Sequence, residues 1–568
     1  MQRALEVLKE NWGYDSFRGI QEDIIRSVMA GHDTLGLMPT GGGKSITFQV
    51  PTLCMEGLCI VVTPLVALMK DQVQNLSRRA ILAAAVHSNM SHEQVLAAYD
   101  NCIYGRTKFL YVSPERLDNE LFQKKVSRMR VALICVDEAH CISQWGYDFR
   151  PAYLEVCKLR ELLPEVPVLA LTATATPDVV DDICRQLNFR AGSQVFRMSF
   201  ERKNLAYIVK HTADKFSTLV SLLREQTEGS VIVYTRSREG TCEIAKHLIE
   251  SGIPALDFHA GMSALDKDMR QRRWQCGDYR VIVATNAFGM GIDKADVRLV
   301  VHVDMPDSIE AYFQEAGRAG RDGLYARAVL LFSPSDVSRM KRHVSQEFPP
   351  KEFCRQIYDE IAYFLQLPIG EGVGRTFEFN IAQFCHNFHR YPATVESALQ
   401  LLTRAGYINY RVGDDNYSRL IMLMRRDDLY YLRQMSPLED RVLRALLRLY
   451  SGMFADYIFI DEQRMAEEAG LTPQEVYDVL LGLSRQRVLS YVPRNGFPHI
   501  TYVQRRIESE RVVFPAAVYD DRLEAYKKRV LAMVGYPTEQ KLCRSRYLLQ
   551  YFGEKIHHDC GHCDVCQS

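Results

Sequence analysis

The sequence predicts an α/β fold with two successive parallel sheets, followed by small helical modules and a metal-binding tail. Three observations support this prediction. Apolar strands alternate with helical segments over residues 34–332, a glycine-rich loop follows the first strand, and three cysteines fall within the last nine residues. Strands that alternate with helices are typical of βαβ units, which build parallel sheets.

The strand segments divide into two groups. LCIVVTP, KFLYVSP and VPVLALTATAT belong to the first predicted sheet, and GSVIVYTRS, RVIVATN and VRLVVHVD form the second, with a boundary near residues 205–215. We expect five domains, at residues 1–207, 208–342, 343–430, 431–512 and 513–568.

Composition narrows the class of protein. The chain has 568 residues, 47% of them hydrophobic and 25% charged, and no apolar run approaches the ~18 residues of a membrane span. The first residues form an amphipathic pattern rather than a signal peptide. The fifteen cysteines stand mostly singly in apolar runs, which favours a reducing cytosol. Net charge is zero, so a nucleic-acid partner would be bound by local basic grooves. We expect a cytoplasmic protein with no membrane partner.

The stretch DTLGLMPTGGGKSITFQVP predicts a phosphate-binding loop, with three glycines (41–43) after an apolar strand. Glycines let backbone N–H groups surround a phosphate chain, Lys44 would reach the β- and γ-phosphates, and Ser45 would hold magnesium. The general pattern asks for glycine at position 38, where this chain has Met38. On this motif alone, a flexible glycine turn is the alternative.

A second motif, VALICVDEAH, strengthens the nucleotide interpretation. Residues 131–136 are almost all apolar, as in a buried parallel strand, and Asp137 follows at the end where α/β sheets place ligand groups. Asp137 would hold magnesium, while Glu138 could orient and deprotonate an attacking water. An exposed acidic strand end is the alternative, and the glycine loop about 90 residues earlier argues against it.

The second predicted sheet carries no phosphate loop but ends in QEAGRAGRDG. Arg318 and Arg321 lie three residues apart, near one face of a helix start. If they face the nucleotide, one can act as an arginine finger on the γ-phosphate. A nucleotide held between two sheets would open and close a cleft on hydrolysis, which indicates a motor.

These motifs together resemble the RecQ family of superfamily 2 DNA helicases. MPTGGGKS, TPLVALMKDQV, YVSPERL, LTATAT, DFHAGM, ATNAFGMGIDKADVR and QEAGRAGRDG match its helicase motifs in order, and YDSFRGIQ looks like its adenine-recognition motif. The resemblance covers residues 5–340 and implies two RecA-like domains that bind ATP and Mg²⁺. The residues expected around the nucleotide are Tyr14, Arg18, Gln21, Thr40, Gly41, Gly42, Gly43, Lys44, Ser45, Asp137, Glu138, Arg318 and Arg321.

The stretch DEAHCISQWGYDFRP resembles the aromatic loop that links single-stranded DNA contact to ATP hydrolysis in this family. Trp145, Phe149 and Arg150 would contact DNA, since aromatic faces stack on bases of any sequence. Tryptophan is often a core residue, but Ser143 and Gln144 beside it argue against burial.

Two winged-helix-like modules are expected after the motor. Amphipathic helices precede a period-2 stretch, YINYRVGDDNYSRLIMLM, which predicts a hairpin, and the pattern repeats up to LSYVPRNGFPHITYVQRR. Such modules bind duplex DNA or serve in protein packing. The stretch GEGVG follows a helix and has the wrong spacing for a nucleotide loop, so we interpret it as a plain turn.

The tail HHDCGHCDVC looks like the family's zinc-binding module, which makes Cys543 the fourth ligand beside Cys560, Cys563 and Cys566. A closed structural Zn²⁺ site needs four such ligands. The alternatives are a redox or free-thiol role for the triplet, or ligation by the histidines His557, His558 and His562.

The order of modules departs from the common family arrangement, in which zinc module and then winged helix follow the motor directly. Here about 170 residues intervene before the zinc tail. The inserted modules replace the missing winged helix, or the chain is truncated.

The resemblance implies an ATP-dependent DNA helicase that moves 3′ to 5′ on single-stranded DNA, with forked duplexes as substrates. A role in replication, recombination or repair would follow. Repair or recombination proteins would be partners, and the protein would be associated with the nucleoid. Family members split duplexes with an aromatic or histidine hairpin tip. Our candidate is the second hairpin, with Phe497 ahead of His499 at its tip, and a proline-bounded surface loop is the alternative. A DEAH-type RNA helicase and a DNA-binding regulator with a vestigial motor are the rival functions.

Overall fold

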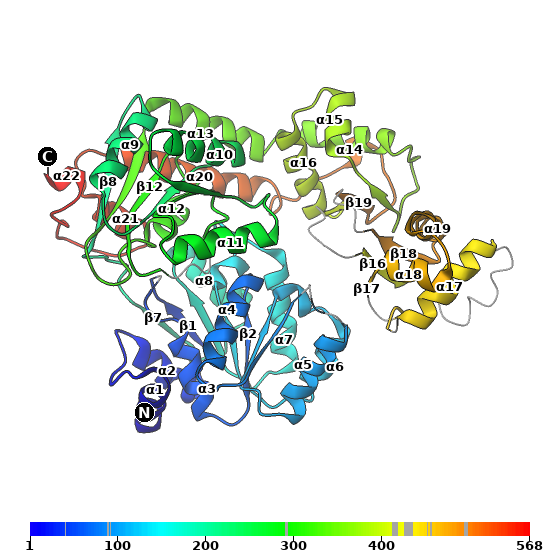
Figure 1. Ribbon diagram of the computed structural model, residues 1–568, viewed down its shortest axis with the longest axis horizontal. Coiled ribbons are helices and arrows are strands. Elements are labelled where there is room, and N and C mark those ends of the chain that lie inside the picture. Colours follow the sequence, from blue (N-terminus) through cyan, green and yellow to red (C-terminus); the bar gives the residue numbers. More distant parts are fainter. Residues whose placement is uncertain are drawn as a thin grey trace. The chain divides into compact units, whose positions relative to one another are not determined.

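The computed structural model describes residues 1–567 except 40, 88–89, 91, 290–293, 412–417, 425–435, 451, 455–456 and 494–497. Its chain divides into two compact units (Figure 1). One comprises Met1–His87, Ala98–Arg342 and Ala525–Ser568, and the other comprises Ser88–Ala97 and His343–Glu524. Among the described residues, every helix is too short or too polar to cross a membrane.

The first sheet is entirely parallel, with strand order β3-β4-β2-β5-β6-β1-β7. Four of its strands, β1, β2, β4 and β6, are buried along their whole length, as expected where helices cover both faces. The strands are β1 Thr34–Leu37, β2 Leu58–Val62, β3 Ala83–Val86, β4 Phe109–Val112, β5 Val131–Val136, β6 Val168–Thr172 and β7 Gln194–Arg197.

Helices alternate with these strands (Figure 1). They are α1 Gln2–Trp12, α2 Gln21–Met29, α3 Ile46–Cys54, α4 Val66–Ser77, α5 His92–Tyr104, α6 Glu120–Val126, α7 Val156–Leu162 and α8 Pro177–Gln186, with short 3₁₀ turns η1 Pro114–Arg116, η2 Ala139–Ile142 and η3 Pro151–Glu155. Strand β6 separates β1 from β5, so the loops after β1 and β5 emerge at the same edge of the sheet.

The second sheet is also entirely parallel, with order β10-β11-β9-β12-β13-β8. Its elements are β8 Leu205–His211, α9 Lys215–Glu225, β9 Ser230–Tyr234, α10 Arg238–Glu250, β10 Ala255–Phe258, α11 Ala264–Gln275, β11 Val281–Ala284, β12 Val297–His302, α12 Ile309–Ala316, β13 Ala326–Phe332 and α13 Pro334–Glu347. Because β8 begins at Leu205, the predicted boundary at residue 207 cuts a strand, and the change of sheet falls between β7 and β8.

The second unit begins with a winged helix. Its elements are α14 Lys351–Phe364, β14 Thr376–Glu378, α15 Ile381–Phe388, α16 Pro392–Arg404, β15 Ile408–Arg411 and β19 His499–Tyr502. The sheet order is β14-β19-β15, and both pairings are antiparallel. The strands β15 and β19 are therefore paired neighbours although residues 412–498 separate them in sequence.

A second winged helix fills that interval. It comprises β16 Ser418–Met422, α17 Pro437–Leu449, β17 Ile458–Ile460, α18 Glu462–Ala469, α19 Pro473–Arg485 and β18 Leu489–Val492, with sheet order β17-β16-β18. Capping boxes begin α17 and α19, where Ser436 pairs with Glu439 and Thr472 with Glu475. Its first strand occupies the centre of the sheet, the place that β19, the last strand, holds in the first module. The second module is thus a circular permutation of the first, nested inside it.

Nesting corrects the two predicted hairpins. Strand β15 lies in one sheet and β16 in the other, and β18 and β19 are divided in the same way. The turn of the first predicted hairpin, within 412–417, and part of the second, 494–497, lie outside the described residues. The boundary predicted at residue 430 is wrong for the same reason, because the first module resumes at residue 499.

The zinc-type tail packs on the second sheet. It consists of α20 Asp520–Thr538, α21 Arg544–Tyr551 and α22 Asp564–Gln567. Asp564 accepts a hydrogen bond from the Val209 amide of β8 and pairs with buried Arg544 at 2.8 Å. Tyr551 donates to Glu310 of α12 at 2.8 Å. The tail therefore belongs to the motor unit, although the winged helices precede it in sequence.

Candidate nucleotide, DNA and zinc sites

The glycine loop follows β1 directly. Met38 is fully buried in the core of the first sheet, so its side chain fills apolar space where the general motif has glycine. Gly41 and Gly43 have φ of 83° and 77°, which side chains rarely adopt, and a Cβ on Gly42 would lie 3.0 Å from the Pro39 carbonyl. These positions need glycine, and the loop can bring backbone N–H groups close to phosphates. Thr40 lies outside the described residues.

Lys44 faces the acidic residues that follow β5. Its ammonium lies 3.3 Å from the carboxylate of Glu138. Burial raises the pKa of Asp137 to about 6, against the opposing charge of Lys44. Burial alone would raise the pKa of Glu138 as well, but Lys44, His140 and Arg318 outweigh it and lower that pKa. Glu138 therefore stays ionised, as a general base must be, while Asp137 holds a costly charge that a divalent cation would offset.

Glu138 also has a strained backbone. Its φ of 48° and ψ of 47° are left-handed, an uncommon conformation for a residue with a side chain. Such strain gathers at functional sites, where the surrounding structure imposes it. One carboxylate oxygen, Oε2, is buried without a hydrogen-bond partner, which leaves it available to a water or substrate.

The two arginines of the second sheet face this site. The charge of Arg318 acts on Glu138, and the charge of Arg321 acts on Lys44. The Cγ of Arg321 lies 3.7 Å from where a Cβ on Gly41 would stand. Arg318 is only 4% exposed, so its guanidinium is held in place rather than solvated. The structure thus brings the motifs of both sheets together.

Tyr234 supports Arg318 from β9. Its hydroxyl donates to the carbonyl of Phe288 at 2.7 Å and hydrogen-bonds the Arg318 guanidinium. The Tyr234 ring stacks on His302 at 5.2 Å, and His302 pairs with Glu315 at 3.0 Å. Sequence motifs did not indicate Tyr234, because a tyrosine in an apolar strand is expected to be an ordinary residue of the hydrophobic core.

The predicted adenine residues lie beside the glycine loop. Arg18 stacks over the Tyr14 ring at 5.0 Å, and Tyr14 is 45% exposed. The side chain of Gln21 accepts from the Arg18 amide and donates to the carbonyls of Gly42 and Gly43 at 3.2 Å. Gln21 therefore connects the predicted base site to the phosphate loop.

The aromatic loop follows η2. Trp145 is 46% exposed, as a base-stacking residue should be, and its carbonyl accepts from Arg529 of α20 at 3.0 Å. Phe149 is half-buried, and the Arg150 guanidinium pairs with Asp148 at 3.1 Å. Arg150 is therefore engaged internally.

A route between this loop and the nucleotide site runs through Tyr147, which the sequence reasoning missed. The Tyr147 ring stacks on His140 at 4.9 Å, and the imidazole of His140 lies 3.4 Å from Glu138. The Tyr147 hydroxyl donates to Gln314 of α12 at 2.8 Å. Burial lowers the pKa of His140, so its ring is neutral and can accept or donate one hydrogen bond. The aromatic spacing WGYDF was the available signal.

Of the two residues predicted to separate DNA strands, the structure describes only His499. Phe497 lies outside the described residues. His499 is 7% exposed and pairs with Arg411 and Glu378 within the sheet of the first winged helix. A buried strand residue cannot stack on a DNA end, so the assignment of His499 to a hairpin tip is wrong.

The recognition helix of the nested module, α19, contacts the first module. Tyr477 donates to Glu378 of β14 at 3.4 Å, and Arg487, just past the helix, donates to the Val373 carbonyl at 2.8 Å. Asp478 on its exposed face would repel phosphates. The helix therefore packs against the first module, which is one of the two roles expected for such modules.

The four tail cysteines converge. Cys543 is the residue directly before α21, and its Sγ lies 3.9 Å from that of Cys563. Cys566 Sγ lies 3.3 Å from Cys563 and 4.0 Å from Cys560. Tetrahedral Zn–S bonds of about 2.3 Å place sulfurs about 3.8 Å apart, so the set fits zinc. His558 and His562 instead contact Glu201 and the Leu205 carbonyl.

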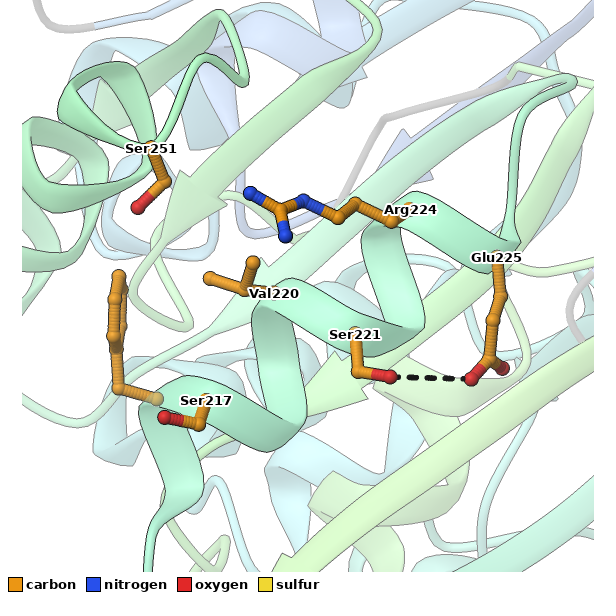
Figure 2. A pocket seen from close by; sticks show the side chains of 7 residues that line it. Ser217, Val220, Ser221, Arg224, Glu225 and Ser251 are labelled. Atoms are coloured by element: carbon orange, nitrogen blue, oxygen red, sulfur yellow. Dashed lines mark hydrogen bonds between the residues drawn. The ribbon is translucent and has the colours of Figure 1, made fainter.

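A separate hollow lies on α9 of the second domain, with a volume of about 600 Å³ (Figure 2). Three of its seven lining residues are serines, and the lining includes the Ser221–Glu225 hydrogen bond of 3.2 Å. No lining residue belongs to the helicase motifs.

Comparisons with known proteins agree with this geometry. The DEAD/DEAH box helicase model matches residues 18–183 and the helicase conserved C-terminal domain matches 214–323. The RecQ helicase winged-helix domain of Bacteroidota matches 420–493, which is the nested module, and the RecQ zinc-binding model matches 500–567.

Curated relatives cover the motor. ATP-dependent DNA helicase RecQ of Bacillus subtilis is 42% identical over 59% of this chain and 57% of its own. RecQ of Haemophilus influenzae is 40% identical over 64% of this chain and 59% of its own. Probable ATP-dependent DNA helicase RecS of B. subtilis is 38% identical over 61% of this chain and 70% of its own. The chain spans a little over half the length of the RecQ relatives it matches.

Among solved structures, the DUF1998 helicase MrfA bound to DNA and AMPPNP has a TM-score of 0.52 at 17% identity, covering 60% of this chain and 52% of that one. This likeness shows the fold. Fold and motifs together define a DEAD/DEAH-box helicase core with two RecA-like domains. Given its RecQ-specific modules and curated relatives, the chain belongs to the RecQ family.

Proposed function

We propose that this protein is an ATP-dependent DNA helicase that moves 3′ to 5′ along single-stranded DNA. The observation that supports this most strongly is the convergence of Lys44 and Glu138 from the first sheet with Arg318 from the second. Hydrolysis between two sheets can change their separation, and DNA held across both would then be moved.

The nucleotide site assigns one task to each side chain. Lys44 would neutralise phosphate charge, Ser45 and Asp137 would hold Mg²⁺, and Glu138 would accept the proton of the attacking water. Bound Mg²⁺ would supply further charge neutralisation at the phosphates. Arg318 and Arg321 stabilise the charge that develops on the γ-phosphate.

The aromatic loop would report DNA engagement. A base stacked on Trp145 orders the loop, and Tyr147 passes that ordering to His140 on one side and Gln314 on the other. Because Gln314 lies in α12, four residues before Arg318, this contact spans both halves of the nucleotide site. Phe149 and Arg150 would complete the DNA contact.

ATPase assays with single-stranded DNA, single-stranded RNA and no nucleic acid test this proposal. Stimulation by DNA well above RNA supports it. Stimulation mainly by RNA would favour the DEAH-type RNA helicase, and absent turnover would favour the regulator with a vestigial motor. Unwinding of forked duplexes with 3′ or 5′ tails tests polarity.

Phe497 stays our candidate for strand separation, since a ring at the fork can stack on the last base pair. Phe497→Ala should lower unwinding while DNA-stimulated ATP turnover persists. Repair or recombination proteins as partners, and a nucleoid location, follow from a role in DNA metabolism.

A further inference from the structure

Three potential metal ligands meet in the second RecA-like domain, outside the nucleotide site and the cysteine tail. They are Cys242 on α10, Asp257 on β10 and His259 directly after β10. Asp257 and His259 are two residues apart, a spacing that in a strand places side chains on one face. Helix α10 packs beside β10 and brings Cys242 to that face.

The distances match those of metal ligands. Cys242 Sγ lies 3.5 Å from Asp257 Oδ2 and 3.6 Å from His259 Nε2. Zinc bonds of about 2.3 Å to sulfur and about 2.1 Å to nitrogen or oxygen, at tetrahedral angles, separate such ligand atoms by about 3.6 Å. All three ligand atoms lie within 4.8 Å of one another. The side chains therefore need little rearrangement to share one cation.

The surroundings orient the ligands. Arg270 contacts Asp257 Oδ1 and its carbonyl oxygen, which turns Oδ2 toward Cys242. An outer partner of this kind is common for metal-bound carboxylates. His259 Nε2 is the imidazole nitrogen directed at the cluster, because it lies 3.6 Å from Cys242 Sγ, while Nδ1 points away and is buried without a hydrogen-bond partner. Cys242 is exposed, which gives a cation access from solvent.

We propose that Cys242, Asp257 and His259 bind a divalent cation of the zinc class, with a fourth position open to solvent. Thiolate, imidazole and carboxylate together suit zinc better than magnesium or calcium, which prefer oxygen ligands. The site is distinct from the closed tail site, whose four thiolates leave no open position. The proposal does not depend on helicase activity.

Zinc content of the full-length protein tests it. After equilibration with zinc, the parent should hold a second equivalent beyond the tail site, and Cys242→Ser should lose that equivalent alone. Cys276→Ser is the matched control, because Cys276 is another exposed cysteine of the same domain outside the cluster. His259→Gln and Asp257→Asn should lose the second equivalent too, with unchanged circular dichroism.

Alkylation gives an independent readout. Zinc should slow modification of Cys242 severalfold and leave that of Cys276 unchanged, because only Cys242 would be metal-bound. A parent that binds a single equivalent, or a Cys242→Ser variant that keeps the second, would overturn the proposal and leave a hydrogen-bonded cluster. Both outcomes are read from metal and thiol chemistry, so they are separate from any ATPase result.

Discussion

The Lys44 ammonium lies 3.3 Å from the Glu138 carboxylate, so the group proposed to neutralise phosphate and the group proposed to accept a proton form one ion pair. Lys44→Ala should lower ATP turnover by roughly 100-fold or more, since removal of one preorganised cation or donor from a reacting centre costs about that much. DNA binding without ATP should stay near that of the parent, while the thermal midpoint should fall, because the buried Glu138 carboxylate loses its cationic partner. Steady-state ATPase and fluorescence anisotropy measure both, and retained turnover would contradict the assignment.

Replacing the Asp137 or the Glu138 carboxylate by a neutral amide should shift the thermal midpoint in opposite directions. Burial raises the pKa of Asp137 to about 6, so the folded protein binds a proton there that the unfolded chain releases near pH 4. Ionised Asp137 therefore costs stability, increasingly as pH rises from about 4 to 6 and fully above that window. Asp137→Asn should raise the thermal midpoint measured without nucleotide near neutral pH, and the gain should shrink toward pH 4.

Glu138→Gln is the matched variant. In the parent, the Glu138 carboxylate has a lowered pKa, so its charged form stabilises the folded protein above the unfolded pKa. That stability is lost as pH falls through the folded pKa. Glu138→Gln should lower the midpoint at neutral pH, and both variants should lose ATP turnover. Equal shifts of the same sign would show that the charges at this site are arranged differently.

Trp145 should be needed for the stimulation of ATP turnover by DNA but not for folding. Trp145→Ala removes a half-exposed ring, and base stacking is worth about 1–3 kcal/mol, so half-maximal stimulation should need about tenfold more single-stranded DNA. Basal turnover should persist. Tyr104→Ala, at a more exposed ring outside the loop, serves as control. A Trp145→Ala protein that unfolds, or that is stimulated like the parent, would refute the loop assignment.

Tyr147→Phe keeps the ring that stacks on His140 and removes only the hydroxyl that reaches Gln314. One hydrogen bond contributes about 0.5–1.5 kcal/mol, so stimulation should fall by about two- to tenfold with basal turnover and DNA affinity retained. Gln314→Ala should have the same effect, and the double variant should be no worse than either single one. Additive losses would mean that the two residues act separately.

The tail cysteines should behave as one structural site. Cys543→Ala and Cys563→Ala each remove one ligand of the same tetrahedron, so both should lower tail-site zinc and the thermal midpoint to a similar degree. Cys184→Ala, at a partly buried cysteine outside the cluster, is the control. Full tail-site zinc in Cys543→Ala would reopen the case for the histidines.

The motifs were predictable because their chemistry is local. Each motif is encoded within a few residues: glycines that need positive φ, a carboxylate after a buried strand, or cysteines at ligand spacing. The resemblance to the RecQ family then placed these motifs in one site or module. Tyr147 and Tyr234 were not indicated, because their roles depend on partners far away in sequence, Gln314 and Arg318. The two hairpin predictions were wrong because consecutive strands usually pair with each other. Nothing local in residues 408–422 indicates that the partner of β15 lies beyond an inserted module.

That nesting makes the inserted module removable. Arg411 and His499 are directly paired across β15 and β19, so their Cα atoms are about 5 Å apart and a two-residue turn can join them. A variant with residues 412–498 replaced by Asn-Gly should fold with the parent's helix and strand content for the remaining chain. Because the motor unit and the zinc tail are untouched, zinc content and DNA-stimulated ATP turnover should persist.

Unwinding of a tailed duplex then separates two roles for the insertion. Loss of unwinding in both this deletion and Phe497→Ala would place strand separation at the end of the inserted segment. Loss in the deletion alone would assign a DNA or positioning role to the nested module without Phe497. A deletion that fails to fold, while the parent folds, would show that the β15–β19 pairing depends on the inserted module and would contradict the nesting argument.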